Sequence, residues 1–240
     1  MQRRWRAATW LLLAIGVAGS IAAATAWRSN VQKESHRVFD TQAADVAASI
    51  SVSLARVDDM TTTMRALVGT RPHMTDAQWN AWVASLDIAH RYAGVLGLAY
   101  VEIVPAARLA AFQRALRADG VESGIAPRPF AVIPAGPRPY YCFVRLGSLG
   151  PELANLPPGL DLCVLAGKDW MAKPRDTAQL QVAPVVLGGR TVAQVIAPVY
   201  TRGVIPASVG QRRHNIIGLA GELFDFNAIL RTAVGAHRGL

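Results

Sequence analysis

Residues suited to catalysis and metal binding are scarce in this chain of 240 residues. Its five histidines are scattered and mostly stand beside surface-type residues, so none pairs with another at metal-ligand spacing. The part after residue 28 has no serine-nucleophile elbow, zinc-binding helix, Walker phosphate loop or dinucleotide glycine fingerprint. The sequence therefore argues against an enzyme, and we expect neither a cofactor nor a metal site.

Only two cysteines are present, Cys142 and Cys163. Two thiols by themselves do not make a structural zinc site. In an exported domain they can form one disulfide, which would close a loop of about 20 residues. Otherwise they are two small buried hydrophobic residues. The residues alone leave both interpretations open.

Lysine is also scarce, with three among the 25 basic residues, although the formal net charge is +9. Four arginines flank the first apolar stretch, at positions 3, 4, 6 and 28, which leaves the body of the chain only mildly basic. The one basic cluster, Arg212-Arg213-His214, is better explained by a solvated loop than by a binding face. We therefore expect no nucleic-acid partner.

Residues 7–27 carry no charge, and a helix of about 20 residues matches the hydrocarbon thickness of a bilayer. The preceding arginines predict that residues 1–6 are cytoplasmic and that the chain after residue 28 is periplasmic. We expect a single-pass anchor in the inner (plasma) membrane. The alternative is a signal peptide cleaved among Ala22–Ala26, but secretory apolar regions are shorter.

Residues 28–70 contain no proline and no glycine before Gly69, which predicts one long helix. Its apolar residues follow a spacing of three and four: Phe39, Ala43, Val46, Ile50, Val57, Met60, Met64 and Leu67. This seam is typical of a stalk that forms a homodimer through a coiled coil. It is equally typical of an amphipathic helix that lies on its own domain, and each interpretation can hold for a different half.

The rest of the chain predicts an α+β domain. Thr75 and Gln78 form a capping box that begins a helix over 77–89, and Val95–Val104 is an extended apolar run. Pro105 begins another helix that Gly120 ends, and Asp225 caps a last short helix. Between these lie five expected strands: Pro129–Ile133, Tyr140–Leu146, Gln179–Leu187, Arg190–Val199 and Asn215–Gly221. Gly188-Gly189 is a hairpin signal between two of them.

Asp161 is unusual because it lies between turn-forming prolines and an apolar segment. A carboxylate beside apolar residues is costly unless it is hydrogen-bonded. Neighbouring backbone N–H groups can satisfy it, or it can accept hydrogen bonds from a small ligand in a pocket. Tyr141 and Tyr200, on expected strands, can supply an aromatic wall for such a pocket.

The order of several motifs resembles the CHASE domain, the extracytoplasmic sensory module of histidine kinases and nucleotide cyclases. The motifs are Tyr92–Tyr100, Val104-Pro105, Leu116–Gly120, Asn155, Gly159–Leu162, Arg175–Thr177, Pro198–Tyr200 and Gly218. The resemblance covers residues 71–232 and leaves 233–240 as a tail. It implies a long helix that leads into two PAS-like antiparallel-sheet lobes, with a ligand site in the distal lobe.

The resemblance also implies a ligand set, in which Asp161 hydrogen-bonds the ligand. With the residues above, the expected ligand-binding residues are Asp161, Leu162, Tyr141, Leu180, Val182 and Tyr200. Ala178 and Lys173-Pro174 depart from the family pattern, so the identity of the ligand does not transfer.

Related receptors return through the membrane to a kinase or cyclase domain, and we expect this chain to be truncated before such an output domain. The alternative is a receptor that has lost its effector. We thus expect a membrane-anchored sensor of a small molecule. The alternative is an anchored periplasmic interaction protein without a ligand.

Overall fold

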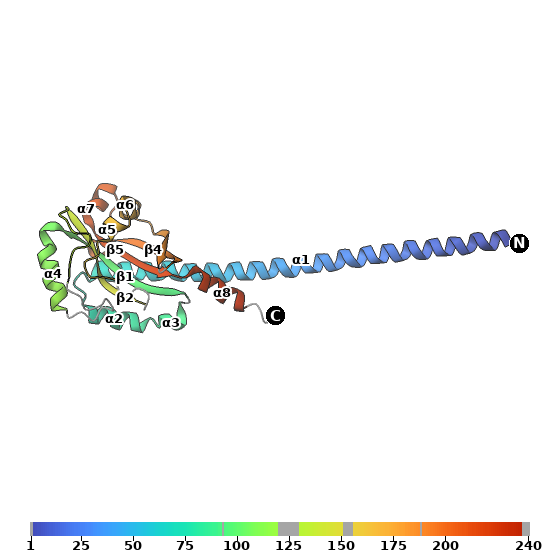
Figure 1. The fold of residues 1–240 in the computed structure, drawn as a ribbon, viewed down its shortest axis with the longest axis horizontal. Coiled ribbons are helices and arrows are strands. Elements are labelled where there is room, and N and C mark those ends of the chain that lie inside the picture. Colours follow the sequence, from blue (N-terminus) through green and yellow to red (C-terminus); the bar gives the residue numbers. More distant parts are fainter. Residues whose placement is uncertain (1, 93, 120–129, 151–155, 188, 237–240) are drawn as a thin grey trace. The chain divides into compact units, whose positions relative to one another are not determined.

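The computed structural model describes residues 2–92, 94–119, 130–150, 156–187 and 189–236. The chain separates into two compact units, Met1–Ser49 with His237–Leu240 and Ile50–Ala236. Helix α1 (Gln2–Thr70) contributes its first part to one unit and its last part to the other (Figure 1). The expected long helix over 28–70 is therefore confirmed.

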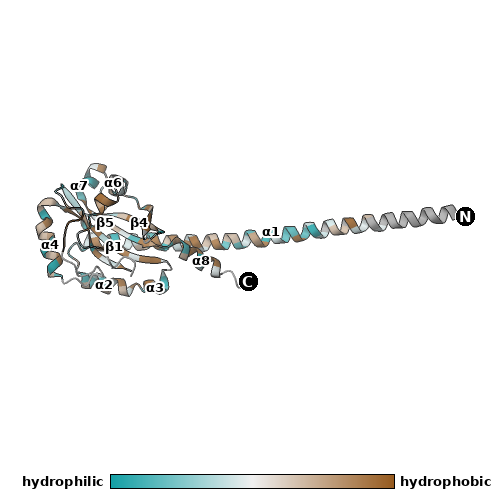
Figure 2. Cartoon of the chain, viewed as in Figure 1, coloured by the Kyte–Doolittle hydropathy of each residue, from teal (hydrophilic) through white to brown (hydrophobic). Residues whose placement is uncertain are grey.

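The second unit is built on one antiparallel sheet with the strand order β2-β1-β5-β4-β3. The strands are β1 (Val95–Pro105), β2 (Tyr140–Leu149), β3 (Gln181–Leu187), β4 (Arg190–Tyr200) and β5 (Ile216–Phe224). These bounds agree closely with the sequence, and Leu187 pairs with Arg190 at the predicted hairpin. Gly188 of that hairpin lies outside the described residues. Strands β4 and β5 carry mostly hydrophobic residues (Figure 2).

Two expectations about strands are wrong. In the described part of Pro129–Ile133 there is no strand, only an isolated bridge between Ile133 and Leu160. Prolines follow closely in this segment, and a proline lacks the N–H that a strand must donate. The described residues also form a single five-stranded sheet rather than the sheets of two lobes. The α+β class is confirmed.

The last part of α1 packs on one face of this sheet. Met60, Met64 and Val68 are buried in a cluster with residues of the sheet and of the following helix. In this half of the helix the apolar spacing therefore reflects packing on its own domain. In the other unit Phe39 is 67% exposed, so there the seam is not covered by described residues of this chain.

Helix α2 (Asp76–Ser85) begins at the predicted capping box. The Gln78 N–H donates to Thr75 Oγ1 at 3.3 Å, and the Thr75 N–H donates to Gln78 Oε1 at 3.1 Å. Trp79 on this helix is fully buried in the cluster that holds Met64. The local sequence thus fixes where the helix begins, and Trp79 anchors it to the core.

The remaining helices are short and surround the sheet. They are α3 (Ile88–Arg91), α4 (Leu109–Ala118), α5 (Leu162–Leu165), α6 (Lys168–Thr177), α7 (Val209–Asn215), α8 (Phe226–Ala236) and the 3₁₀ turns Ala106–Arg108 and Thr201–Gly203. At the start of α8 the Asn227 N–H donates to Asp225 Oδ1 at 2.9 Å, which confirms the predicted cap. Gly120, the expected end of α4, lies outside the described residues.

Among the residues that the structure describes, no helix combines the length and the apolarity needed to cross a membrane. For most residues of the span expected at 7–27, the structure describes the helical backbone and not the side chain, so these side chains do not enter that finding.

Candidate functional site

A disulfide between Cys142 and Cys163 joins β2 to α5. Their Cα atoms are 5.4 Å apart, and 21 positions separate them in sequence. Of the two interpretations that the sequence leaves open, the structure therefore has the disulfide. Closing a loop of this length stabilises the folded chain by about 3 kcal/mol.

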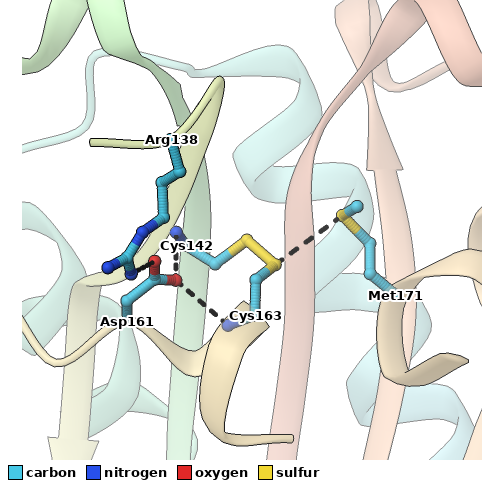
Figure 3. The surroundings of a disulfide bond; sticks show 5 residues. All are labelled: Arg138, Cys142, Asp161, Cys163 and Met171. Carbon is cyan, nitrogen blue, oxygen red and sulfur yellow. Dashed lines mark hydrogen bonds and ion pairs between the residues drawn. A yellow bond between two sulfur atoms is a disulfide. The ribbon is translucent and has the colours of Figure 1, made fainter. Parts of the chain in front are cut away.

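Asp161 lies beside this disulfide and is 0% exposed (Figure 3). Its Oδ1 accepts from the Cys142 N–H at 3.0 Å and from the Cys163 N–H at 3.1 Å, and caps α5. Its Oδ2 accepts from Arg138 Nη1 at 2.6 Å. Both carboxylate oxygens are thus occupied within the protein, and Asp161 positions α5 against β2.

The other expected site residues lie apart from one another. Tyr141 stacks on Phe143 in an aromatic cluster, with the Arg138 guanidinium over its ring. Tyr200 is buried and donates to the Arg175 carbonyl at 2.7 Å. Leu180 packs on the cluster of Val57, Val195, Phe224 and Ile229, whereas Val182 is 63% exposed on the edge strand. The structure does not bring these four residues together.

Leu162 is the member of the expected set that lines a cavity. This apolar cavity has a volume of about 360 Å³ and lies between the sheet and the α5–α6 segment. Its lining includes Gly97, Ala99, Val101, Leu160, Leu162, Leu165, Trp170, Gln194, Ile196, Leu219, Gly221 and Leu223. Pockets of this size and composition are typical of sites for small molecules.

Small side chains on the sheet make this space. Gly97, Ala99 and Gly221 present little or no side chain to the cavity that they line. Gly97 and Ala99 line it together because residues two positions apart in a strand share one face. The expected site did not include them. The signal in the sequence was the alternation of small and large residues in β1, in which Gly97 and Ala99 alternate with Leu98 and Tyr100.

Apart from Glu222, whose carboxyl contacts α1, one polar pair stands in the otherwise apolar lining. Trp170 Nε1 donates to Gln194 Oε1 at 2.8 Å, which fixes the orientation of the Gln194 amide. The amide nitrogen of Gln194 has no hydrogen-bond acceptor among the residues that the structure describes. The cavity therefore offers apolar walls and one fixed N–H donor, which suits a flat, mostly apolar molecule that carries an acceptor.

Strand β5 connects this cavity to α1. Glu222 borders the cavity and is 1% exposed, and its Oε1 is in hydrogen-bond contact with Thr61 of α1. Burial raises the pKa of the Glu222 carboxyl to about 7; Thr61 opposes that rise, and the charge of Asp58 adds to it. Thr61 Oγ1 also lies 3.0 Å from the Val57 carbonyl.

The Thr61 hydroxyl has one proton to donate. When Glu222 is protonated, it can donate to Thr61 while Thr61 donates to Val57, and the contact between the sheet and α1 is complete. An ionised Glu222 must compete with Val57 for the same proton. The protonation of Glu222 therefore affects how α1 is held on the sheet.

Comparison with known proteins gives a family. The CHASE domain model matches residues 72–239, which is most of the chain. No curated protein matches the sequence.

Among solved structures, the periplasmic sensory domain of the Campylobacter jejuni chemoreceptor Tlp1 is similar at 12% identity and a TM-score of 0.42. The match covers 84% of this chain and 62% of that chain, so the present chain spans less than two thirds of its length.

The family match carries the assignment, and all the motifs that suggested the same family lie within the matched residues. The chain belongs to the CHASE family, whose members are extracytoplasmic domains that sense signals and do not catalyse reactions.

Proposed function

We propose that this chain is a membrane-anchored sensor whose domain binds a small, mostly apolar molecule in the apolar cavity. The cavity is the observation that carries the proposal. It has the volume of a small-molecule site, it is lined by apolar side chains, and Gln194 provides one directed N–H group. Leu162 is the expected ligand residue that contributes to it.

Asp161 has a positioning role in this proposal. It fixes the start of α5, and Leu162 and Leu165 of α5 line the cavity. The disulfide holds the same helix to β2. Together they keep one wall of the cavity in place before a ligand arrives, which lowers the entropic cost of binding.

The anchor in this proposal is the uncharged segment 7–27, with residues 1–6 in the cytoplasm and the domain in the periplasm. Its support is the match of its length to the bilayer and the arginines at positions 3, 4 and 6. We also infer that the sheet and its helices correspond to one PAS-like lobe.

A homodimer through the first part of α1 completes the proposal. Phe39 of the apolar seam is exposed there, and its burial against a second copy would remove apolar surface from water. Ligand binding would bias the packing of α1 on the sheet, because β5 borders the cavity and also contacts Thr61. Sedimentation of the full chain in detergent tests the dimer, and a monomer at all concentrations would exclude it.

The binding test uses two flat probes that carry a ring-nitrogen acceptor, adenine and quinoline, titrated into the full chain in detergent. Ala99→Leu fills the apolar cavity, and Ala207→Phe adds bulk at an exposed alanine as the matched control. We expect Ala99→Leu to abolish binding of the probe that the wild type binds, and Ala207→Phe to leave that binding unchanged. Binding that survives Ala99→Leu, or no binding of either probe at millimolar concentration, would favour the alternative, an anchored interaction protein without a ligand.

A further inference from the structure

A second cavity, which we call the charged cavity, lies on the opposite face of β1 from the apolar cavity. It has a volume of about 520 Å³ and is bounded by Pro72-His73 after α1, by β1, by Arg145 of β2 and by α4. Tyr100 and Glu102 of β1 line it, whereas the intervening Val101 lines the apolar cavity. The alternation of a β-strand thus separates two spaces of different chemistry.

Alanines on α4 make the room. Ala111, Ala115 and Ala118 line the cavity at helical spacing, while Phe112 packs in the aromatic cluster. Opposite them the Tyr100 ring forms a rigid wall, because its hydroxyl donates to the Ile217 carbonyl at 3.1 Å. Gly218 permits this position, since a Cβ there would lie 2.8 Å from Tyr100 Oη.

The charges around this space fall into a paired and an unpaired group. Arg145 forms ion pairs with Asp119 and, at 3.6 Å, with Asp76. Glu102 and Arg108 line the same cavity, yet neither makes a hydrogen bond or an ion pair with any residue that the structure describes. Within the described part of the chain, the cavity therefore holds one cation, the exposed Arg108, and one anion, the half-buried Glu102, that form no hydrogen bond or ion pair.

Glu102 is half-buried, and a half-buried carboxylate without a partner is unfavourable. Burial raises the pKa of Glu102, and the positive charges of Arg108 and Arg145 offset that rise in part. A cation placed against Glu102 would relieve this cost, and the exposed guanidinium of Arg108 lines the same cavity and can bind an anion. A ligand with both charges satisfies both residues at once.

We propose that the charged cavity binds a small zwitterion of the α-amino-acid class, with its ammonium group on Glu102 and its carboxylate on Arg108. This site goes beyond the proposed function, because it lies on the other face of the sheet and takes a different class of ligand. Its position beside Pro72-His73 places it directly after the end of α1. A bound zwitterion would contact the sheet and α4 at that end.

The test begins with a thermal-shift screen of each standard L-amino acid on the full chain in detergent, followed by calorimetry on the one that binds best. The amine and the carboxylic acid that each lack one charged group of that amino acid serve as matched ligands. Glu102→Gln and Arg108→Gln should each weaken binding about ten- to a hundred-fold, as expected for a hydrogen bond to a charged group. Both single-charge analogues should bind correspondingly weakly.

Two controls separate this site from its surroundings. Arg114→Gln removes an exposed arginine of α4, and Ala99→Leu fills the apolar cavity; both should leave amino-acid binding unchanged. Circular dichroism confirms that each variant is folded. The absence of binding by any standard amino acid at millimolar concentration would overturn the proposal, and so would binding unaffected by Glu102→Gln and Arg108→Gln. Binding lost only in Ala99→Leu would overturn it too, while supporting a ligand in the apolar cavity.

Discussion

Replacing Glu222 by glutamine should make the domain more stable at neutral and alkaline pH. Glu222 is 1% exposed, and the pKa of its carboxyl is raised from 4.5 to about 7, chiefly by burial. Its Oε2 has no hydrogen-bond partner among the described residues. Glutamine has nearly the same shape and no charge, and its amide can donate to Thr61 as the protonated carboxyl does.

The direction in which stability changes with pH follows from the raised pKa of Glu222. The folded chain binds the proton on Glu222 more tightly than the unfolded chain, so the contribution to stability is fully present below about pH 4.5. It is lost as the pH rises towards about 7, because the folded state then pays for a buried charge. A pKa of about 7 instead of 4.5 corresponds to a loss of about 3 kcal/mol, at about 1.4 kcal/mol for each tenfold change in proton affinity.

Urea unfolding of the full chain in detergent, followed by tryptophan fluorescence from pH 5 to pH 8, measures this loss. The free energy of unfolding of the wild type should fall over that range, and the fall should be absent in Glu222→Gln. Glu34→Gln, at an exposed glutamate of α1, is the matched control and should keep the wild-type slope. Asp58→Asn removes a neighbouring negative charge and should reduce the fall. Equal slopes for the wild type and Glu222→Gln would refute the reasoning.

Asp161→Asn keeps the side-chain shape but removes the negative charge that pairs with Arg138. We expect about 2 kcal/mol less stability at pH 7, because Arg138 is only 17% exposed and would keep a largely buried charge without its partner. A loss within the error of urea unfolding would show that the ion pair contributes nothing. The double replacement of Cys142 and Cys163 by alanine should lower stability by about 3 kcal/mol, measured by thermal unfolding with and without reductant, and reductant should then have no further effect. Thr75→Ala removes one half of the capping box and should cost about 1 kcal/mol in urea unfolding; an unchanged midpoint would mean that α2 does not need its cap.

The sequence by itself determined the features that depend on neighbouring residues. The capping box at Thr75 and Gln78 forms between residues three positions apart, and the helix over 28–70 follows from a run with no proline and no glycine before Gly69. The strand positions follow from apolar runs bounded by turn residues, and the hairpin between β3 and β4 needs only a short connection. The order of motifs was enough to suggest the family that the family match shows.

The expected ligand set depends on contacts between residues that are distant in the sequence. Asp161 carried the right signal, a carboxylate in an apolar segment, but the sequence could not tell a ligand from an internal partner. The partner is Arg138, 23 positions away, together with two backbone N–H groups. Residues such as Gly97, Ala99 and Gly221 carry no chemical signal, because their contribution to the cavity is the space they leave.

Only the tertiary structure decided which faces of the strands meet which helices. Thr61 and Glu222 are 161 positions apart and meet because β5 lies at the centre of the sheet, under α1. The disulfide and the two cavities depend in the same way on strand order and register, and a shift of one residue would exchange the faces of a strand. Local periodicity determines where the helices and strands begin and end, whereas long-range packing determines the contacts and cavities between them.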